Sequence, residues 1–184
     1  MAETILVTGG ARSGKSRMAE QLASGFDAVT YIATSIPVDV EMRHRIDKHR
    51  QRRPDSWITV EKYRDLDRVI AGHSHSKAIL LDCITVMVSN LMLDLNIDWD
   101  KASMSDFDRA EKEVMGEIGK LIDGIRCFEG RFIIVTNEVG MSLVPEYPLG
   151  RAFRDIAGFV NQRLAEISDT VYLMVSGIAV KIKG

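Results

Sequence analysis

The sequence predicts an α/β fold with a mostly parallel sheet flanked by helices, and two patterns support this prediction. Short runs that are apolar throughout alternate with longer segments of helical periodicity, as is typical of strands covered on both faces by helices. No Pro/Gly/Ser-rich linker or internal repeat divides the chain, and 184 residues suit one domain. We therefore expect a single domain that spans residues 1–184.

Each expected element follows from one of these patterns. Five apolar runs predict strands, at residues 5–8, 29–33, 79–82, 132–136 and 171–175. Apolar residues spaced three and four apart predict helices, at residues 15–23, 40–50, 66–72, 85–93, 107–125 and 150–167. At the end of the chain, Ser176-Gly177 separates two β runs. It predicts a hairpin with an antiparallel edge strand whose outer face is protected by lysines.

Composition and charge exclude several classes of protein. The formal charge is −2, from 24 Lys+Arg against 26 Asp+Glu, so no net positive field attracts nucleic acid or an anionic membrane. The most apolar segment, residues 84–93, is shorter than the roughly 20 residues of a membrane span, and the N-terminus lacks a secretory layout. We expect a cytoplasmic protein without nucleic-acid partners. Cys83 and Cys127 show no disulfide or zinc spacing and are expected to be buried thiols.

A glycine-rich motif lies between the first strand and the first helix, the place where a P-loop NTPase carries its phosphate loop. Glycines let backbone N–H groups converge on phosphate oxygens, while Lys15 reaches the β- and γ-phosphates and Ser16 ligates Mg²⁺. The motif therefore predicts a nucleotide site, the alternative being a fortuitous glycine-rich turn. Its residues, which fit GxxxxGK[ST], are Gly9, Gly10, Ala11, Arg12, Ser13, Gly14, Lys15 and Ser16.

Two acidic residues follow later strands at the edge where ligands of such a sheet bind. Asp82 ends the third predicted strand and would share a Mg²⁺ ion with Ser16, unless it only caps the next helix. Glu138 follows the fourth strand and either supports the same site or is a cap or surface acid.

A basic segment over residues 43–53 contains six Lys/Arg and a single Asp. Within it, Met42, Ile46 and His49 share one helical face, which by itself favours a structural role for His49. Neighbouring cations lower the pKa of a histidine and keep its ring neutral at neutral pH, so a nucleophilic role is the other interpretation. His73 and His75 are expected to be loop residues, and no further ligand pattern supports a metal role for them.

More specific runs occur in order along the chain, among them YIATS, LLDC, TNEVG, VPE and the segment 39–61. On the basis of these runs and the phosphate loop, the chain resembles, over nearly its whole length, the bifunctional adenosylcobinamide kinase / adenosylcobinamide-phosphate guanylyltransferase family of cobalamin biosynthesis. Segment 39–61 and TNEVG are far more specific than the phosphate loop. The resemblance implies a RecA-like P-loop fold and a homotrimer.

The resemblance also implies two reactions. Enzymes of this family phosphorylate the aminopropanol hydroxyl of adenosylcobinamide with ATP or GTP. They then transfer GMP from GTP to adenosylcobinamide phosphate through a histidine–GMP intermediate, which the motif places at His49, with Lys15 as the second catalytic residue. The implied nucleotide contacts outside the phosphate loop are Ala33, Thr34, Ser35, Arg50, Gln51, Arg52, Arg53, Glu61 and Asp82.

Two other functions are compatible with a phosphate loop. A P-loop kinase for another small metabolite would use the same loop, with His49 only structural and no nucleotidyl transfer. A GTP-dependent switch or binding protein is disfavoured, because the chain contains no NKxD run, the usual guanine-reading signature.

Overall fold

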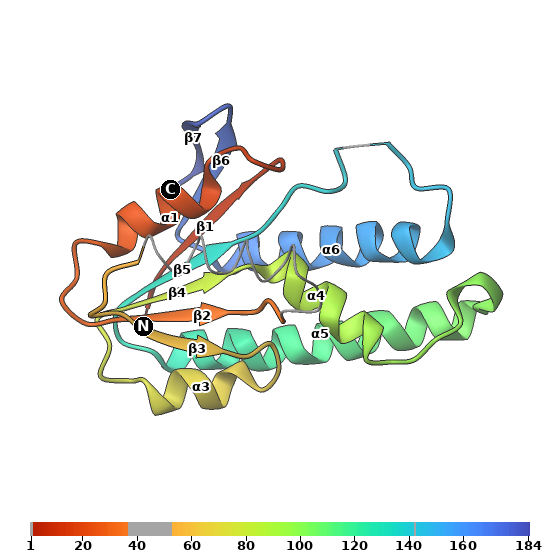
Figure 1. The fold of residues 1–184 in the computed structure, drawn as a ribbon, viewed down its shortest axis with the longest axis horizontal. Coiled ribbons are helices and arrows are strands. Elements are labelled where there is room, and N and C mark those ends of the chain that lie inside the picture. Colours follow the sequence, from red (N-terminus) through yellow and green to blue (C-terminus); the bar gives the residue numbers. More distant parts are fainter. Residues whose placement is uncertain (1, 37–52, 142) are drawn as a thin grey trace.

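The computed structural model describes residues 2–36, 53–141 and 143–184 (Figure 1). At its centre lies a seven-stranded sheet with the order β3-β2-β4-β5-β1-β6-β7. Every adjacent pair is parallel except β6 and β7, which are antiparallel. The predicted fold class, a mostly parallel sheet with an antiparallel C-terminal edge strand, is confirmed. The helix expected over residues 40–50 lies outside the described residues.

Five strands agree with the predicted apolar runs to within two residues at either end, and β3 was not predicted. It is a four-residue edge strand with exposed end residues, so it lacks the continuous apolar pattern of a covered strand. The strands are β1 (Glu3–Gly9), β2 (Val29–Ala33), β3 (Ile58–Glu61), β4 (Ala78–Asp82), β5 (Arg131–Val135), β6 (Thr170–Val175) and β7 (Ile178–Lys183).

The described helices also match the predicted segments, to within three residues at either end. Helix α5 starts three residues early because Ser103 and Asp106 form a capping box, and Pro148 starts α6. A 3₁₀ turn, η1 (Trp99–Lys101), was not predicted. The helices are α1 (Lys15–Ala23), α3 (Leu66–Gly72), α4 (Ile84–Leu93), α5 (Met104–Cys127) and α6 (Pro148–Ile167).

The sheet is covered on both faces, with α1 on one face and α3, α4, α5 and α6 on the other (Figure 1). Successive strand residues point to opposite faces, so Leu6 joins the large core under α3 to α6, while Val7 joins the smaller core under α1. None of the described helices is long and apolar enough to cross a membrane. Both layers leave the carboxyl ends of the parallel strands free to carry a site.

The C-terminal hairpin turns at Ser176 and Gly177, which both have positive φ, as a two-residue turn of the primed type requires. Its backbone contacts the glycine-rich motif, because the Gly177 N–H donates a 3.0 Å hydrogen bond to the carbonyl oxygen of Ser13. The hairpin therefore lies directly beside the predicted phosphate loop.

The outer strand of this hairpin is exposed along its whole length, the lysines and the apolar residues Ile178, Val180 and Ile182 alike. Lys183, next to an irregularity in the register of β6 and β7, donates hydrogen bonds to the carbonyl oxygens of Ala165 and Glu166 at the end of α6. The antiparallel edge strand is confirmed, and the protection of its outer face by lysines stays a prediction.

Candidate active site

The carboxyl ends of the parallel strands bring several predicted contacts into one row. The strand register pairs Ala33 with Asp82 on one side and with Glu61 on the other. Strand β5 lies between β4 and β1, and its last residue, Val135, pairs with both Asp82 and Val7. The acidic end of β4 is therefore one strand away from the phosphate loop.

The loop after β1 has a backbone that glycine permits. Gly9 has a φ of 143°, and a Cβ there would collide with the carbonyl oxygen of Met174. Gly14 has a φ of 97° and is the N-cap of α1, so the helix begins at Lys15. Arg12 also has a positive φ, of 56°. The first turn of α1 thus opens onto a tightly wound loop, the arrangement in which backbone N–H groups bind phosphate.

Lys15 lies inside this loop rather than on the surface. Its side chain is buried, and Nζ donates a 2.6 Å hydrogen bond to the carbonyl oxygen of Gly10. Burial lowers the pKa of Lys15, and the charges of Asp82 and Glu138 partly oppose this. The buried hydroxyl of Ser13 has no hydrogen-bond partner among the described residues. The loop therefore holds a cation and an unpaired donor, both suited to phosphate oxygens.

Asp82 is held by a buried tyrosine. The hydroxyl of Tyr31 donates a 3.0 Å hydrogen bond to Asp82 Oδ2, and the Arg53 guanidinium lies 3.3 Å from the centroid of the Tyr31 ring. Burial raises the pKa of Tyr31, and the Asp82 carboxylate adds to this. The N-cap residue of α4 is Cys83, so the interpretation of Asp82 as a helix cap is wrong.

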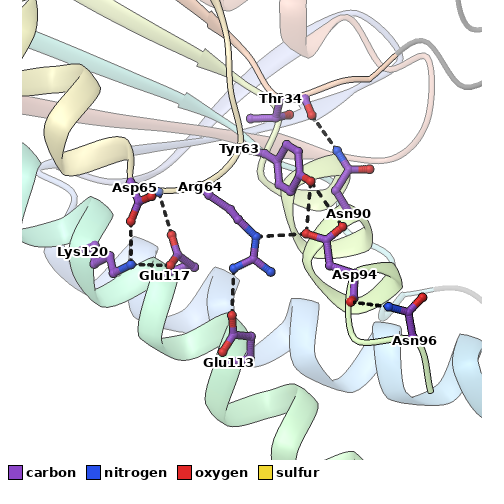
Figure 2. A network of polar contacts seen from close by, with 10 residues as sticks. All are labelled: Thr34, Tyr63, Arg64, Asp65, Asn90, Asp94, Asn96, Glu113, Glu117 and Lys120. Carbon is purple, nitrogen blue, oxygen red and sulfur yellow. Dashed lines mark hydrogen bonds and ion pairs between the residues drawn. The ribbon is translucent and has the colours of Figure 1, made fainter.

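The segment after β2 is fastened to β4 and α4. Thr34 Oγ1 donates a 2.7 Å hydrogen bond to the carbonyl oxygen of Cys83 and accepts the Cys83 N–H at 3.0 Å. The side-chain amide of Asn90 donates to the Thr34 carbonyl oxygen (Figure 2). The predicted contacts Ala33, Thr34 and Ser35 thus begin at the same edge as Asp82.

Glu138 lies against the first residue of the phosphate loop. Its backbone N–H donates a 3.1 Å hydrogen bond to the carbonyl oxygen of Gly9, and its Oε1 accepts a 2.7 Å hydrogen bond from the hydroxyl of Thr8. The side chain is half-buried. The interpretation of Glu138 as a free surface acid is therefore wrong, and the carboxylate belongs to the loop region.

A single amide on α6 orders the residues before Glu138. Asn161 Oδ1 accepts a 2.6 Å hydrogen bond from the hydroxyl of Thr136. Its Nδ2 donates to the carbonyl oxygen of Asn137 at 3.0 Å and to Glu138 Oε1 at 3.4 Å. Asn137 in turn donates to Thr85 Oγ1 on α4. The run that follows β5 is therefore braced from two helices.

Four of these residues were not predicted from the sequence: Thr8, Tyr31, Asn90 and Asn161. Their signal is weak, since each is a polar side chain within or beside an apolar pattern. Asn90, for example, interrupts the most apolar segment of the chain. Each of them is linked to the site by a hydrogen bond to a residue that is distant in sequence.

The proposed nucleophile and the three positions after it, His49, Arg50, Gln51 and Arg52, lie outside the described residues. His73 and His75 follow α3, and His73 Nδ1 lies 2.8 Å from the Val69 carbonyl oxygen. No group of three His, Cys, Asp or Glu side chains within the described ranges is placed to hold a metal ion.

The two cysteines have different surroundings. The Cys83 sulfur lies 3.3 Å from Thr85 Oγ1, and burial raises the pKa of this thiol to about 11. Cys127 is exposed at the last position of α5, so the expectation that both thiols are buried is wrong for Cys127.

Among solved structures, one similar chain comes from a structural and biochemical analysis of a prototypical ATPase from the type III secretion system of pathogenic bacteria. The match has a TM-score of 0.56 at 10% identity and covers 95% of this chain and 52% of that one. At this identity the likeness shows the fold alone, a P-loop ATPase type of sheet.

Closer relatives match over their full length. The bifunctional adenosylcobalamin biosynthesis protein CobU of Escherichia coli is 50% identical over 180 residues, and its Salmonella typhimurium counterpart is 51% identical over 185 residues. Both alignments cover 97% of this chain and 99% of the relative. The corresponding CobP protein of Pseudomonas aeruginosa is 39% identical, with 97% and 96% covered. A family model described as cobinamide kinase / cobinamide phosphate guanyltransferase matches residues 5–182. The chain therefore belongs to this family and is an enzyme with these two activities.

Proposed function

We propose that both reactions take place at the carboxyl edge of the sheet, on a nucleotide whose phosphates lie in the loop of residues 9–16. The observation that carries this proposal is the position of Lys15. Its buried ammonium group lies at the start of α1 and within the electrostatic reach of Asp82 and Glu138. A cation so placed neutralises the β- and γ-phosphate oxygens that the loop N–H groups also bind. Glu61 and residues 33–35 complete the nucleotide contacts along the same edge.

Mg²⁺ belongs to this site as a partner of the phosphates. The hydroxyl of Ser16 and the Asp82 carboxylate are hard oxygen ligands, and they supply fewer positions than the ion needs. Substrate phosphates and water would supply the remaining ligands. When bound, the ion neutralises charge on the phosphate oxygens.

In the kinase reaction, the aminopropanol hydroxyl of adenosylcobinamide attacks the γ-phosphorus of ATP or GTP. An O–P bond to the alcohol forms, and the bond to the nucleoside diphosphate breaks, with its electron pair passing to the β-phosphate oxygen. Lys15 and the loop N–H groups hold the phosphates in line and stabilise the developing charge.

In the guanylyl transfer, the His49 imidazole attacks the α-phosphorus of GTP and pyrophosphate leaves. The phosphate of adenosylcobinamide phosphate then attacks the same phosphorus, which breaks the N–P bond and gives adenosylcobinamide-GDP. Arg50, Gln51, Arg52 and Arg53 contact the nucleotide beside His49. The described residues on either side of this basic segment support its place at the site. Before it, Thr34 is hydrogen-bonded to Cys83 at the edge of the sheet. After it, Arg53 stacks on Tyr31, whose hydroxyl donates a hydrogen bond to Asp82.

The chain acts as one catalytic domain in a homotrimer. Exposed apolar side chains on the hairpin, Ile178 and Ile182 among them, support self-association, because rows of this kind are buried in subunit contacts. Light scattering measures the subunit number directly, and a monomer at assay concentration would refute the trimer.

The labelled nucleotide tests whether His49 carries the guanylyl group. Wild-type protein incubated with α-labelled GTP is expected to retain an acid-labile label, and His49→Asn is expected to retain none while still phosphorylating adenosylcobinamide. Wild-type protein that never takes up label, but phosphorylates a small alcohol, would establish the simple kinase instead.

A further inference from the structure

Glu138 has a position that neither the phosphate loop nor the proposed metal site uses. It follows β5, the strand adjacent to β1, and its N–H is bonded to the Gly9 carbonyl oxygen. The residue therefore sits at the entrance of the loop, between the loop and the end of β4. Asp82 lies one strand further toward β2, where residues 33–35 and Arg53 gather.

The orientation of this carboxylate is fixed by its neighbours. Oε1 accepts from the Thr8 hydroxyl at 2.7 Å and from Asn161 Nδ2 at 3.4 Å, and Asn161 is itself held by Thr136. Within the described part of the chain, Oε2 makes no hydrogen bond. Oε1 is thus held in place by two hydrogen bonds, and Oε2 keeps both lone pairs available to a ligand at the loop.

The charge of Glu138 acts on Lys15. It is one of the charges that oppose the effect of burial on the pKa of Lys15, the residue that contacts the β- and γ-phosphates in the site proposed above. An alcohol that approaches the γ-phosphorus from beyond the loop therefore passes near this carboxylate. Asp82 is less suited to the same task, because its Oδ2 is occupied by the Tyr31 hydroxyl and its place fits Mg²⁺.

The segment that follows Glu138 suits the alcohol-bearing substrate. Four large apolar side chains on it are exposed: Met141, Leu143, Val144 and Tyr147. Cobinamide carries its aminopropanol arm on a broad macrocycle with apolar faces, and such a ligand prefers an exposed apolar surface next to the reacting group. The apolar segment thus continues directly from the carboxylate that lies against the phosphate loop.

Building on the function proposed above, we propose that Glu138 is the general base of the kinase reaction. Its Oε2 accepts the proton of the aminopropanol hydroxyl as the alcohol oxygen forms its bond to the γ-phosphorus. The bond between that phosphorus and the leaving nucleoside diphosphate breaks, and the proton then passes from Glu138 to water. Guanylyl transfer needs no such base, because its nucleophiles are a neutral imidazole and an ionised phosphate.

The test compares the two activities in the full-length Glu138→Gln variant. The amide keeps an oxygen for the Thr8 and Asn161 donors, so the fold and the nucleotide site are preserved. We expect the kcat for adenosylcobinamide phosphorylation to fall by about 10²- to 10⁴-fold. We expect labelling by α-labelled GTP, and transfer of the label to adenosylcobinamide phosphate, to stay at the wild-type level. Glu138→Asp is expected to restore part of the kinase activity.

Glu129→Gln is the matched control, since Glu129 is an exposed acid at the opposite end of β5 and should retain both activities. Wild-type kinase activity in Glu138→Gln, or an equal loss of both activities, would overturn the assignment. Label uptake and cobinamide phosphorylation by the wild-type protein test the proposed function, whereas the Glu138 variants test only the general base. A result that refutes one proposal can therefore be told apart from a result that refutes the other.

Discussion

The side-chain amide of Asn90, on α4, donates a 2.8 Å hydrogen bond to the main-chain carbonyl oxygen of Thr34, just past the end of β2 (Figure 2). A helix that carries no predicted nucleotide contact thereby sets the position of a segment that does. The bond lies at the point where the chain leaves the sheet toward the basic segment.

Asn90→Ala should therefore weaken nucleotide binding without unfolding the protein. Loss of one hydrogen bond costs about 0.5–1.5 kcal/mol, which corresponds to a rise of roughly 2- to 13-fold in the KM for GTP. Asn96→Gly is the control, because the Asn96 amide bonds only locally to Asp94 and glycine tolerates its positive φ. An unchanged KM in Asn90→Ala would show that the Thr34 segment holds its place without this bond.

Lys15→Ala should reduce both activities by about 10²- to 10³-fold, because in the proposed site this one buried cation serves both phosphate transfers. Parallel kinase and guanylylation assays at saturating nucleotide measure this. Lys77→Ala removes an exposed lysine before β4 and should leave both rates intact. Retention of either activity in Lys15→Ala would mean that the two reactions bind phosphates in different places.

Two glycines of α5 should respond to alanine in opposite ways. A Cβ on Gly124 would lie 2.9 Å from Asp67 Cα on α3, so Gly124→Ala forces the helices apart and costs about 1–3 kcal/mol of unfolding free energy. A Cβ on Gly119 meets nothing within 4 Å, so Gly119→Ala gains about 1 kcal/mol from helix propensity. Urea unfolding of both variants measures the difference, and equal midpoints would contradict the close packing of α3 on α5.

Glu117 should be the most sensitive member of the polar network between α3 and α5 (Figure 2). Its carboxylate is buried and accepts the Asp65 N–H at 2.8 Å and Lys120 Nζ at 2.6 Å. Glu117→Ala leaves the Asp65 N–H unpaired and should lower the unfolding free energy by about 1–3 kcal/mol. Lys120→Ala should lower it less, since the lysine is solvated. A larger loss from Lys120→Ala than from Glu117→Ala would refute this order.

The two thiols should react at very different rates. Burial raises the pKa of Cys83 to about 11, so at pH 8 it remains almost wholly protonated, and its thiolate forms only as the pH rises toward that value. Exposed Cys127 should take up iodoacetamide at pH 8 while Cys83 stays unmodified in the folded protein. Peptide mass spectrometry locates the label, and modification of Cys83 before Cys127 would contradict its burial.

The sequence was sufficient for the covered strands and for the glycine-rich loop between β1 and α1, because both depend on local patterns. Runs that are apolar throughout indicate burial on two faces, and the glycine pattern indicates a backbone with positive φ. Strand β3 was not predicted, because an exposed edge strand has no continuous apolar run. The contact of Lys183 with the end of α6 was not predicted, since alternation alone does not say where a helix end will lie.

The site was harder to predict than the fold, for a physical reason. Thr8 and Glu138 are 130 residues apart, yet they share a 2.7 Å hydrogen bond because β1 and β5 are neighbours in the sheet. Strand order is set by the packing of the whole domain and leaves no local mark on either residue. His49 and the three residues after it remain predictions, since they lie outside the described part of the chain.

The path of β7 has a practical consequence for anyone who handles this enzyme. The strand runs back from its turn beside Ser13, so that Gly184 comes to rest against Asp169, which exchanges hydrogen bonds with Thr4. Thr4 and Gly184 thus both lie near Asp169, at the rim opposite the glycine motif. An affinity tag, a fluorophore or a surface tether attached beyond either residue would leave the proposed catalytic rim open to a bulky corrinoid.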